Sequence, residues 1–175
     1  MNTHLVLTVI GDDRPGLVGA LSRTISAHGG NWLSASMAQL AGKFAGIVEV
    51  AVACDQDAAL RAALAALPDL RMTIEAAAAE NTVVAGRRLK LSLVGHDRIG
   101  IVREVSAVLA RHAVNVERLD TRVGSAPMSA DPLFHAEAEL TAASALDAGA
   151  LIAELEHLSN DLMVDLTLDE NIRKR

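Results

Sequence analysis

Residues 5–18 read Leu5-Val6-Leu7-Thr8-Val9-Ile10-Gly11-Asp12-Asp13-Arg14-Pro15-Gly16-Leu17-Val18, and a related stretch begins 84 positions later as Leu89-Lys90-Leu91-Ser92-Leu93-Val94-Gly95-His96-Asp97-Arg98-Ile99-Gly100-Ile101-Val102. The correspondence continues through the pairs Ser22/Ser106, His28/His112 and Asn31/Asn115. Phe44 then corresponds best to Phe134, so the second copy has about six additional residues around 124–133. A repeat of this kind indicates that the chain contains one structural unit twice.

Both copies show the same succession of periodicities. Residues 5–10 and 89–94 are short apolar runs that end at a glycine, which is typical of strands. Apolar residues at helical spacing come next, at Leu17, Leu21 and Ile25 in the first copy. Further alternation predicts strands over 33–38 and 44–52, joined by a hairpin at Gly42. Second helices are predicted over 60–67 and 151–158, and final strands over 70–74 and 162–168.

The order strand, helix, strand, strand, helix, strand defines the fold class. With right-handed crossovers, βαββαβ gives a four-stranded antiparallel sheet that carries two helices on one face. We therefore expect an α+β protein with two ferredoxin-like domains in tandem. Their expected bounds are 1–79 and 87–175, with a linker over 80–86.

Composition excludes several classes of function. The chain has 175 residues, of which 51% are apolar and 22% are charged, enough for packed cores. Sixteen basic and 22 acidic residues give a net charge of −6, which disfavours contact with a phosphate backbone. The aromatic residues are Trp32, Phe44 and Phe134, too few for a base-stacking platform. We expect no direct nucleic-acid binding.

Motifs for metal, cofactor or covalent chemistry are not visible. Cys54 is the single cysteine, and the six histidines lack metal-ligand spacing. The sequence shows no P-loop and no nucleophile elbow, so we expect neither a cofactor nor enzymatic activity. No apolar run reaches the length of a membrane span, and no signal peptide is visible. The expected location is therefore the cytoplasm.

The repeated turn between the first strand and the first helix carries the most specific signal. Its two versions are Gly11-Asp12-Asp13-Arg14-Pro15-Gly16-Leu17 and Gly95-His96-Asp97-Arg98-Ile99-Gly100-Ile101, and an Asn opens the next strand in both copies. This pattern resembles the ACT domain, the amino-acid-sensing module of amino-acid metabolism, over residues 3–79 and 87–170. Two such domains with the stretch 125–134 in the second hairpin are similar to the glycine cleavage system transcriptional repressor family.

The chemistry of the turn suits a small zwitterion. A glycine that opens a helix exposes backbone N–H groups and the positive end of the dipole to a carboxylate. An aspartate accepts hydrogen bonds from an ammonium group, and an asparagine donates and accepts them. The resemblance implies a ligand pocket where two such domains pair side by side. The ligand-binding residues that it implies are Asp13, Arg14, Gly16, Leu17 and Asn31, and in the second copy Asp97, Arg98, Gly100, Ile101 and Asn115.

Structural roles for the same residues stay open. The aspartate of each copy stands where a helix N-cap belongs, and the arginine could pair with a neighbouring carboxylate or brace an interface. The asparagine could close the helix in the left-handed conformation. The copies also differ, since His96 replaces Asp12 and Ile99 replaces Pro15, so equal occupancy of two sites is not expected.

The resemblance implies a non-enzymatic regulator that senses a small amino acid, glycine or serine, and controls transcription of the glycine cleavage system by contact with an activator protein. A ligand of five heavy atoms gains at most roughly 7.5 kcal/mol, so its dissociation constant is micromolar or weaker. Edge strands that need a partner favour a homodimer. The alternative function is a ligand-independent assembly or scaffold module of the same fold.

Overall fold

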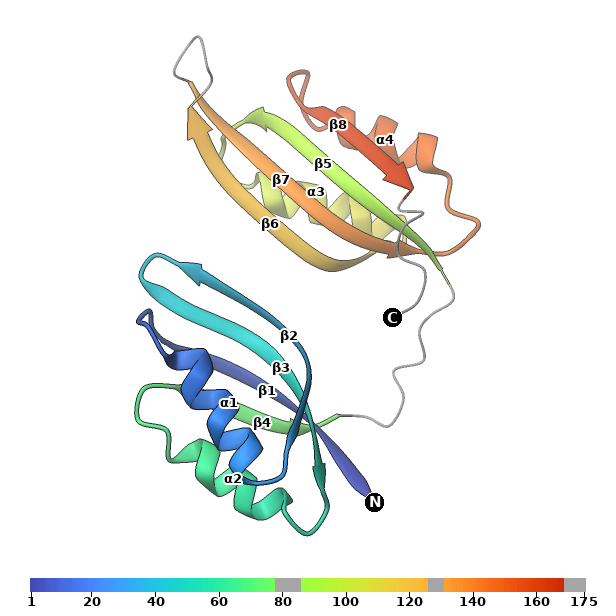
Figure 1. Cartoon of the computed structure of the whole chain (residues 1–175). Helices are drawn as coiled ribbons and strands as arrows, with labels where there is room; N and C mark the ends of the chain where they lie inside the picture. The colour runs from blue at the N-terminus through green and yellow to red at the C-terminus, as the bar shows by residue number, and fades with distance from the viewer. Residues whose placement is uncertain (78–85, 126–130, 169–175) are drawn as a thin grey trace. The chain divides into compact units, whose positions relative to one another are not determined.

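The computed structural model describes residues 1–77, 86–125 and 131–168. The chain divides into two compact units, Met1–Thr82 and Val83–Arg175, each with its own sheet and pair of helices (Figure 1). The expected linker over 80–86 lies outside the described residues except for Gly86. Residues 126–130 of the second hairpin also lie outside them.

The first unit has the predicted element order. Its sheet has the strand order β2-β3-β1-β4, every neighbouring pair is antiparallel, and both helices cover the same face (Figure 1). The elements are β1 (Asn2–Asp12), α1 (Leu17–Ala27), β2 (Asn31–Leu40), β3 (Lys43–Ala53), α2 (Asp57–Ala65) and β4 (Arg71–Ala76).

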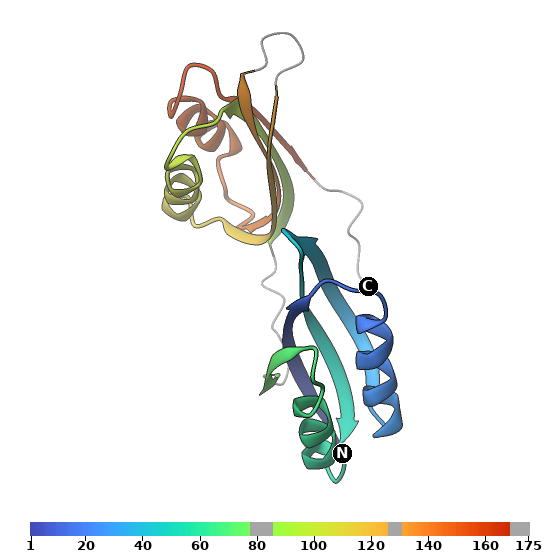
Figure 2. The ribbon, with the colours of Figure 1, turned by 90° about the vertical axis from the view of Figure 1, so that its left-hand side faces the viewer.

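The second unit repeats this arrangement. Its strand order is β6-β7-β5-β8, again antiparallel throughout, with α3 and α4 on one side of the sheet (Figure 2). The elements are β5 (Arg87–His96), α3 (Ile101–Arg111), β6 (Asn115–Ser125), β7 (Pro132–Ala142), α4 (Ala148–Glu156) and β8 (Met163–Leu168). The predicted fold class, two ferredoxin-like domains in tandem, is confirmed.

Alternation along the central strands builds each core. In β1, Leu5 and Leu7 have no exposed surface, whereas the residues between them point to the other side of the sheet. Leu21 and Ile25 from α1 and Leu60 and Leu64 from α2 cover that layer. Each such side chain stabilises the fold by about 1.5–3 kcal/mol when it is removed from water.

The second strand of each unit begins at the predicted asparagine. β2 starts at Asn31 and β6 starts at Asn115. In the first copy the alternation is visible only from residue 33, because the pairing with β3 shifts between Trp32 and Ser34 and a bulge breaks the period-two pattern there. The same irregularity lies between Val116 and Arg118 in β6.

Candidate functional site

A glycine in the left-handed conformation begins the first helix of each unit. Gly16 has φ 96° and Gly100 has φ 93°, and neither helix has a side-chain cap. The Gly16 carbonyl accepts the N–H of Ala20 at 2.8 Å, so the helical ladder starts at the glycine itself. The interpretation of Asp13 and Asp97 as N-caps is therefore wrong, because glycine occupies the cap position.

Glycine is required at Gly16 for its backbone angle and not for lack of space. A Cβ at this position would have no atom within 4 Å. A side chain would strain the backbone, since L-residues avoid this region of φ. The helix start at Gly16 therefore faces open space, whereas the corresponding position at Gly100 has Arg103 and Glu104 within 4 Å.

The aspartates of the turns are exposed and tied by their backbones to the neighbouring hairpin. The N–H of Asp13 donates to the Gly42 carbonyl at 2.9 Å, and the N–H of Asp97 donates to the Pro132 carbonyl at 3.0 Å. These bonds hold the backbone of the turn in place. The Asp13 and Asp97 carboxylates make no side-chain hydrogen bond to another described residue, which leaves them available to an ammonium group.

The arginines of the turns contact their own domain. Arg14 pairs with Asp69, in the loop before β4. Arg98 donates to the Glu104 carboxylate at 2.6 Å and to the Leu158 carbonyl at 3.3 Å. The hydrogen bond from Arg98 holds the pKa of Glu104 below its usual value. Both arginines therefore brace the turn against the loop that precedes the last strand.

Leu17 and Ile101 are core residues. Their side chains are 4% and 5% exposed and pack into the hydrophobic clusters of their units. Burial leaves no room for a ligand to contact these side chains from solvent. Any contribution to binding would come from their backbone N–H groups at the helix start.

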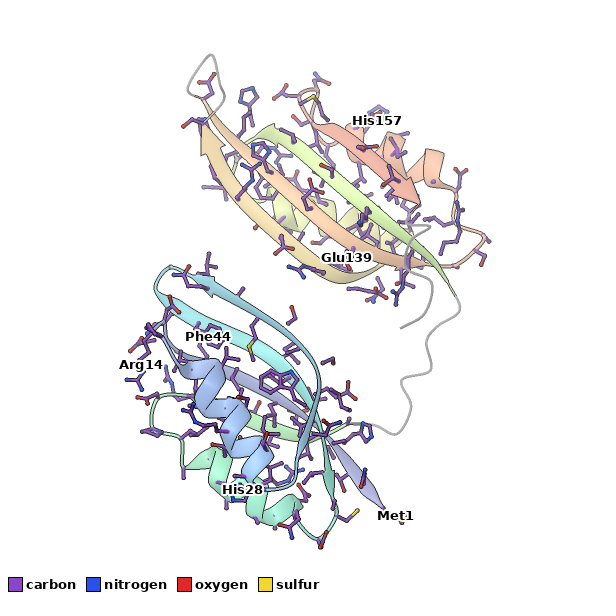
Figure 3. The ribbon with its side chains drawn as sticks, in the orientation of Figure 1. Met1, Arg14, His28, Phe44, Glu139 and His157 are labelled. Atoms are coloured by element: carbon purple, nitrogen blue, oxygen red, sulfur yellow. The ribbon has the colours of Figure 1, made fainter. Side chains whose placement is uncertain are left out.

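The asparagines do not lie beside the turns of their own domains. Asn31 begins β2 and Asn115 begins β6, each after the C-terminal end of the preceding helix. The left-handed residues at these helix ends are Gly29 and Ala113, so the proposed helix-closing role of the asparagines is wrong. An α1 of 11 residues is about 16 Å long, and it separates the Gly16 turn from Asn31. Figure 3 labels Arg14 and His28 near the two ends of this helix.

The five candidate residues of one domain therefore form two groups. Asp13, Arg14, Gly16 and Leu17 share one turn, whereas Asn31 lies at the opposite end of α1; the second unit divides in the same way. One small ligand cannot touch both groups of a single domain. A site that uses both groups needs an asparagine from another domain.

The second unit has an apolar cleft that the sequence argument missed. The cleft lies between α3 and the strands β5, β6 and β7, follows α3 from Val102 to Leu109, and has a volume of about 30 Å³. Its lining carries no charged residue. The residues that line it are Leu91, Leu93, Val102, Val105, Ser106, Leu109, Val116, Leu119, Thr121, Phe134, Ala136 and Ala138.

Smaller side chains in the second copy account for this cleft. By strand register, Val116 stands where the first unit has Trp32, and Thr121 stands where it has Met37. Trp32 and Met37 both pack against the first core. The signal was present in the sequence as a loss of side-chain volume between the copies, but it is readable only once the register of the repeat is known.

No group of three or more metal-ligating side chains occurs among the described residues. Within that same part of the chain, no helix is long and apolar enough to cross a membrane. Asp12, which precedes the first turn, forms an ion pair with Lys43. The hydrogen bond from Lys43 lowers the pKa of Asp12.

The comparisons with known proteins agree with this geometry. Residues 3–77 match the family model of the ACT domain. The second unit repeats the fold of the first, so the chain contains the ACT fold twice in tandem. A comparison with curated proteins found no match.

Two solved structures are similar over the whole chain. An unknown protein from Galdieria sulphuraria is 27% identical with a TM-score of 0.82, and the match covers 97% of this chain and 99% of that one. A candidate glycine cleavage system transcriptional repressor is 18% identical with a TM-score of 0.72, covering 98% and 99% of the two chains. The tandem arrangement is thus shared with proteins of nearly the same length.

Proposed function

We propose that this chain is a non-enzymatic regulatory protein of the cytoplasm that binds a small amino acid at the glycine-opened helix starts. The observation that carries the proposal is the duplicated turn, with φ 96° at Gly16 and 93° at Gly100. Backbone N–H groups at a helix start attract a carboxylate. The adjacent Asp13 and Asp97 supply acceptors for an ammonium group. Glycine and serine fit best, since they have both charged groups and little else.

The separation of the asparagines from the turns supports a site that is shared between two domains. We infer that a second ACT domain, paired side by side, brings its asparagine to the turn of the first. Binding then couples the ligand to domain pairing, because a ligand shifts an equilibrium by its differential affinity for the two states. A homodimer with such pairing can report an amino-acid level to a partner protein.

The output that we propose is control of transcription of the glycine cleavage system through contact with an activator protein. The similar structure of a candidate glycine cleavage system transcriptional repressor supports this choice. The net charge of −6 favours a protein partner over direct contact with DNA.

Isothermal titration of the full chain with a panel of amino acids tests ligand binding. We expect a saturable heat for glycine or serine, and for glycine, with five heavy atoms, a dissociation constant no tighter than micromolar. The double substitution Asp13→Ala/Asp97→Ala should abolish the heat, whereas Asp55→Ala, at an exposed aspartate remote from the turns, should not. Circular dichroism checks that each variant is folded. Absence of heat across the panel at millimolar ligand would favour the scaffold function.

A further inference from the structure

The two sheets differ strongly on the face turned away from their helices, which we call the open face. On the central rows of the first open face stand Ser36, Ala38, Ala45, Ile47, Thr8 and Ile10. The corresponding residues of the second sheet are Asp120, Arg122, His135, Glu137, Ser92 and Val94. In these central rows the second open face is thus charged and suited to water, whereas the first is apolar or carries short hydroxyl side chains. Charged side chains of the first open face stand in the adjoining positions, at Glu49, Arg71 and Glu75.

Large apolar side chains on the first open face are in contact with water. Ile47 is 55% exposed and Ile10 is 42% exposed, although both stand on interior strands of the sheet. The hydroxyl groups of Thr8 and Thr73 bond to each other across β1 and β4, which reduces their need for solvent. Large apolar side chains that are exposed near each other on a sheet face favour packing against another protein surface.

We propose that the first open face packs against the same face of a second copy of this chain, related by a two-fold axis that runs across the strands. The size of the face supports this occupant. Four strands about 4.8 Å apart and roughly 30 Å long cover roughly 600 Å² in each copy. Two faces together reach about 1,200 Å², the lower limit of stable interfaces. Stacked sheets also leave about 10 Å between them, enough for interleaved side chains.

Charge complementarity selects this axis. Arg71 and Glu75 stand on the open face of β4, two residues before and two residues after Thr73. A two-fold axis across the strands at the level of Thr73 places Glu75 of one copy over Arg71 of the other, twice. No ion pair joins either side chain to another residue of the described chain. The same axis stacks Ile47 on Ile47 and Val6 on Ile10. It also places Glu49, which is hydrogen-bonded to His4 and Ser34 of its own sheet, over Ala45 of the other copy.

The proposal does not depend on amino-acid binding or on the edge strands β2 and β6. Equilibrium sedimentation of the full chain without amino acid, at about 1 to 300 μM, tests it, because an interface of this size can dissociate in the micromolar range. We expect Ile47→Glu to halve the mass of the assembly, to 18.3 kDa if the wild type is a dimer. Glutamate is compatible with the fold there, since Glu137 occupies the corresponding position of the second sheet. Equal masses for wild type and Ile47→Glu, or a wild-type monomer throughout, would overturn the proposal.

Charge exchange tests the axis. Arg71→Glu and Glu75→Arg should each weaken association at least tenfold, and the double variant Arg71→Glu/Glu75→Arg should restore it. The matched controls, Met163→Glu and Thr167→Arg on the second open face, should leave the mass unchanged. A double variant no better than the single ones contradicts the axis.

Cross-linking separates stacking of faces from pairing of edges. In a Cys54→Ser background, Ile47→Cys should cross-link between chains through a short bis-maleimide, and Glu137→Cys should not. Equal yields at both positions would overturn the proposal.

Discussion

Arg98 and Glu104 form a 2.6 Å ion pair across the first turn of α3, and Arg98 also reaches the Leu158 carbonyl. The first unit holds its turn by a different pair, Arg14 with Asp69. The Arg14–Asp69 pair and the hydrogen bond from Arg98 to the Leu158 carbonyl both hold the glycine-opened helix start against the loop before the last strand. The arginine of each motif therefore holds the backbone of the proposed site in place through contacts within its own domain.

The Arg98 brace predicts a pH dependence. The hydrogen bond from Arg98 lowers the pKa of Glu104, so the ionised carboxylate is favoured in the folded state. Its contribution to stability is present above the unfolded pKa near 4.5 and is lost as the pH falls through the folded value. We expect Glu104→Gln to reduce the loss of stability between pH 7 and pH 3, measured by urea unfolding. Glu156→Gln, at an exposed residue of α4 without a side-chain ion pair to a described residue, is the control, and an equal reduction there would contradict the assignment.

Replacement of glycine by alanine should lower stability at a left-handed position and raise it at a helical position. Gly16→Ala places a side chain at φ 96° and should destabilise the protein by about 1–2 kcal/mol. Gly149→Ala lies inside α4, where alanine is the better helix former, and should stabilise by up to about 1 kcal/mol. Thermal unfolding measures both. A neutral Gly16→Ala would show that its backbone angle is not required.

The left-handed conformation of Ala113 predicts that a glycine at this position stabilises the protein. This residue has φ 52° at the end of α3, where the first unit has Gly29 with φ 68°. The N–H of Ala113 bonds to the Ala110 carbonyl at 3.0 Å, so the conformation is part of the helix end. We expect Ala113→Gly to raise the unfolding free energy by about 1 kcal/mol and Gly29→Ala to lower it similarly. Chemical unfolding of both variants measures these changes. Changes of the same sign in the unfolding free energy would contradict the prediction.

The packing at the apolar cleft predicts that substitutions at Thr121 and Ala136 have coupled effects on stability. Gly46 lies under Met37 in the first unit, where an added Cβ would collide with the methionine side chain. The second unit has Ala136 and Thr121 at the corresponding positions. Thr121→Met alone should therefore gain little stability, because the Ala136 methyl group occupies the space that Gly46 leaves to Met37. In the double variant Thr121→Met/Ala136→Gly, we expect a favourable coupling of at least about 1 kcal/mol. Additive effects would contradict the assigned register.

Much of the architecture follows from the sequence because burial and periodicity are local signals. The alternation of Leu5, Leu7 and Val9 and the helical spacing of Leu17, Leu21 and Ile25 predict their elements directly, and the repeat supplies each prediction twice. The asparagines of the repeated motif correctly mark the starts of β2 and β6, although a bulge interrupts the alternation just after them.

The site was less accessible to sequence reasoning. Gly16 and Gly100 were correctly placed at helix starts, but the roles of the flanking residues depend on three-dimensional distance. The N-cap and left-handed roles considered for the aspartates and asparagines were wrong, because glycine or Ala113 occupies those conformations. The separation of Asn31 from Gly16 by the length of α1 needed the structure. So did the contrast between the open faces, which depends on register across strands.

Two-dimensional ¹H–¹⁵N spectra of the labelled full chain, titrated with glycine and then with serine, test the central claim most directly. Binding at the helix starts through paired domains predicts saturable shifts of the Gly16 and Asn31 amides together, with one common dissociation constant. The second copy should show the same behaviour at Gly100 and Asn115 if it binds. Spectra that stay unchanged at millimolar ligand, or shifts that leave both glycines unaffected, would contradict the account.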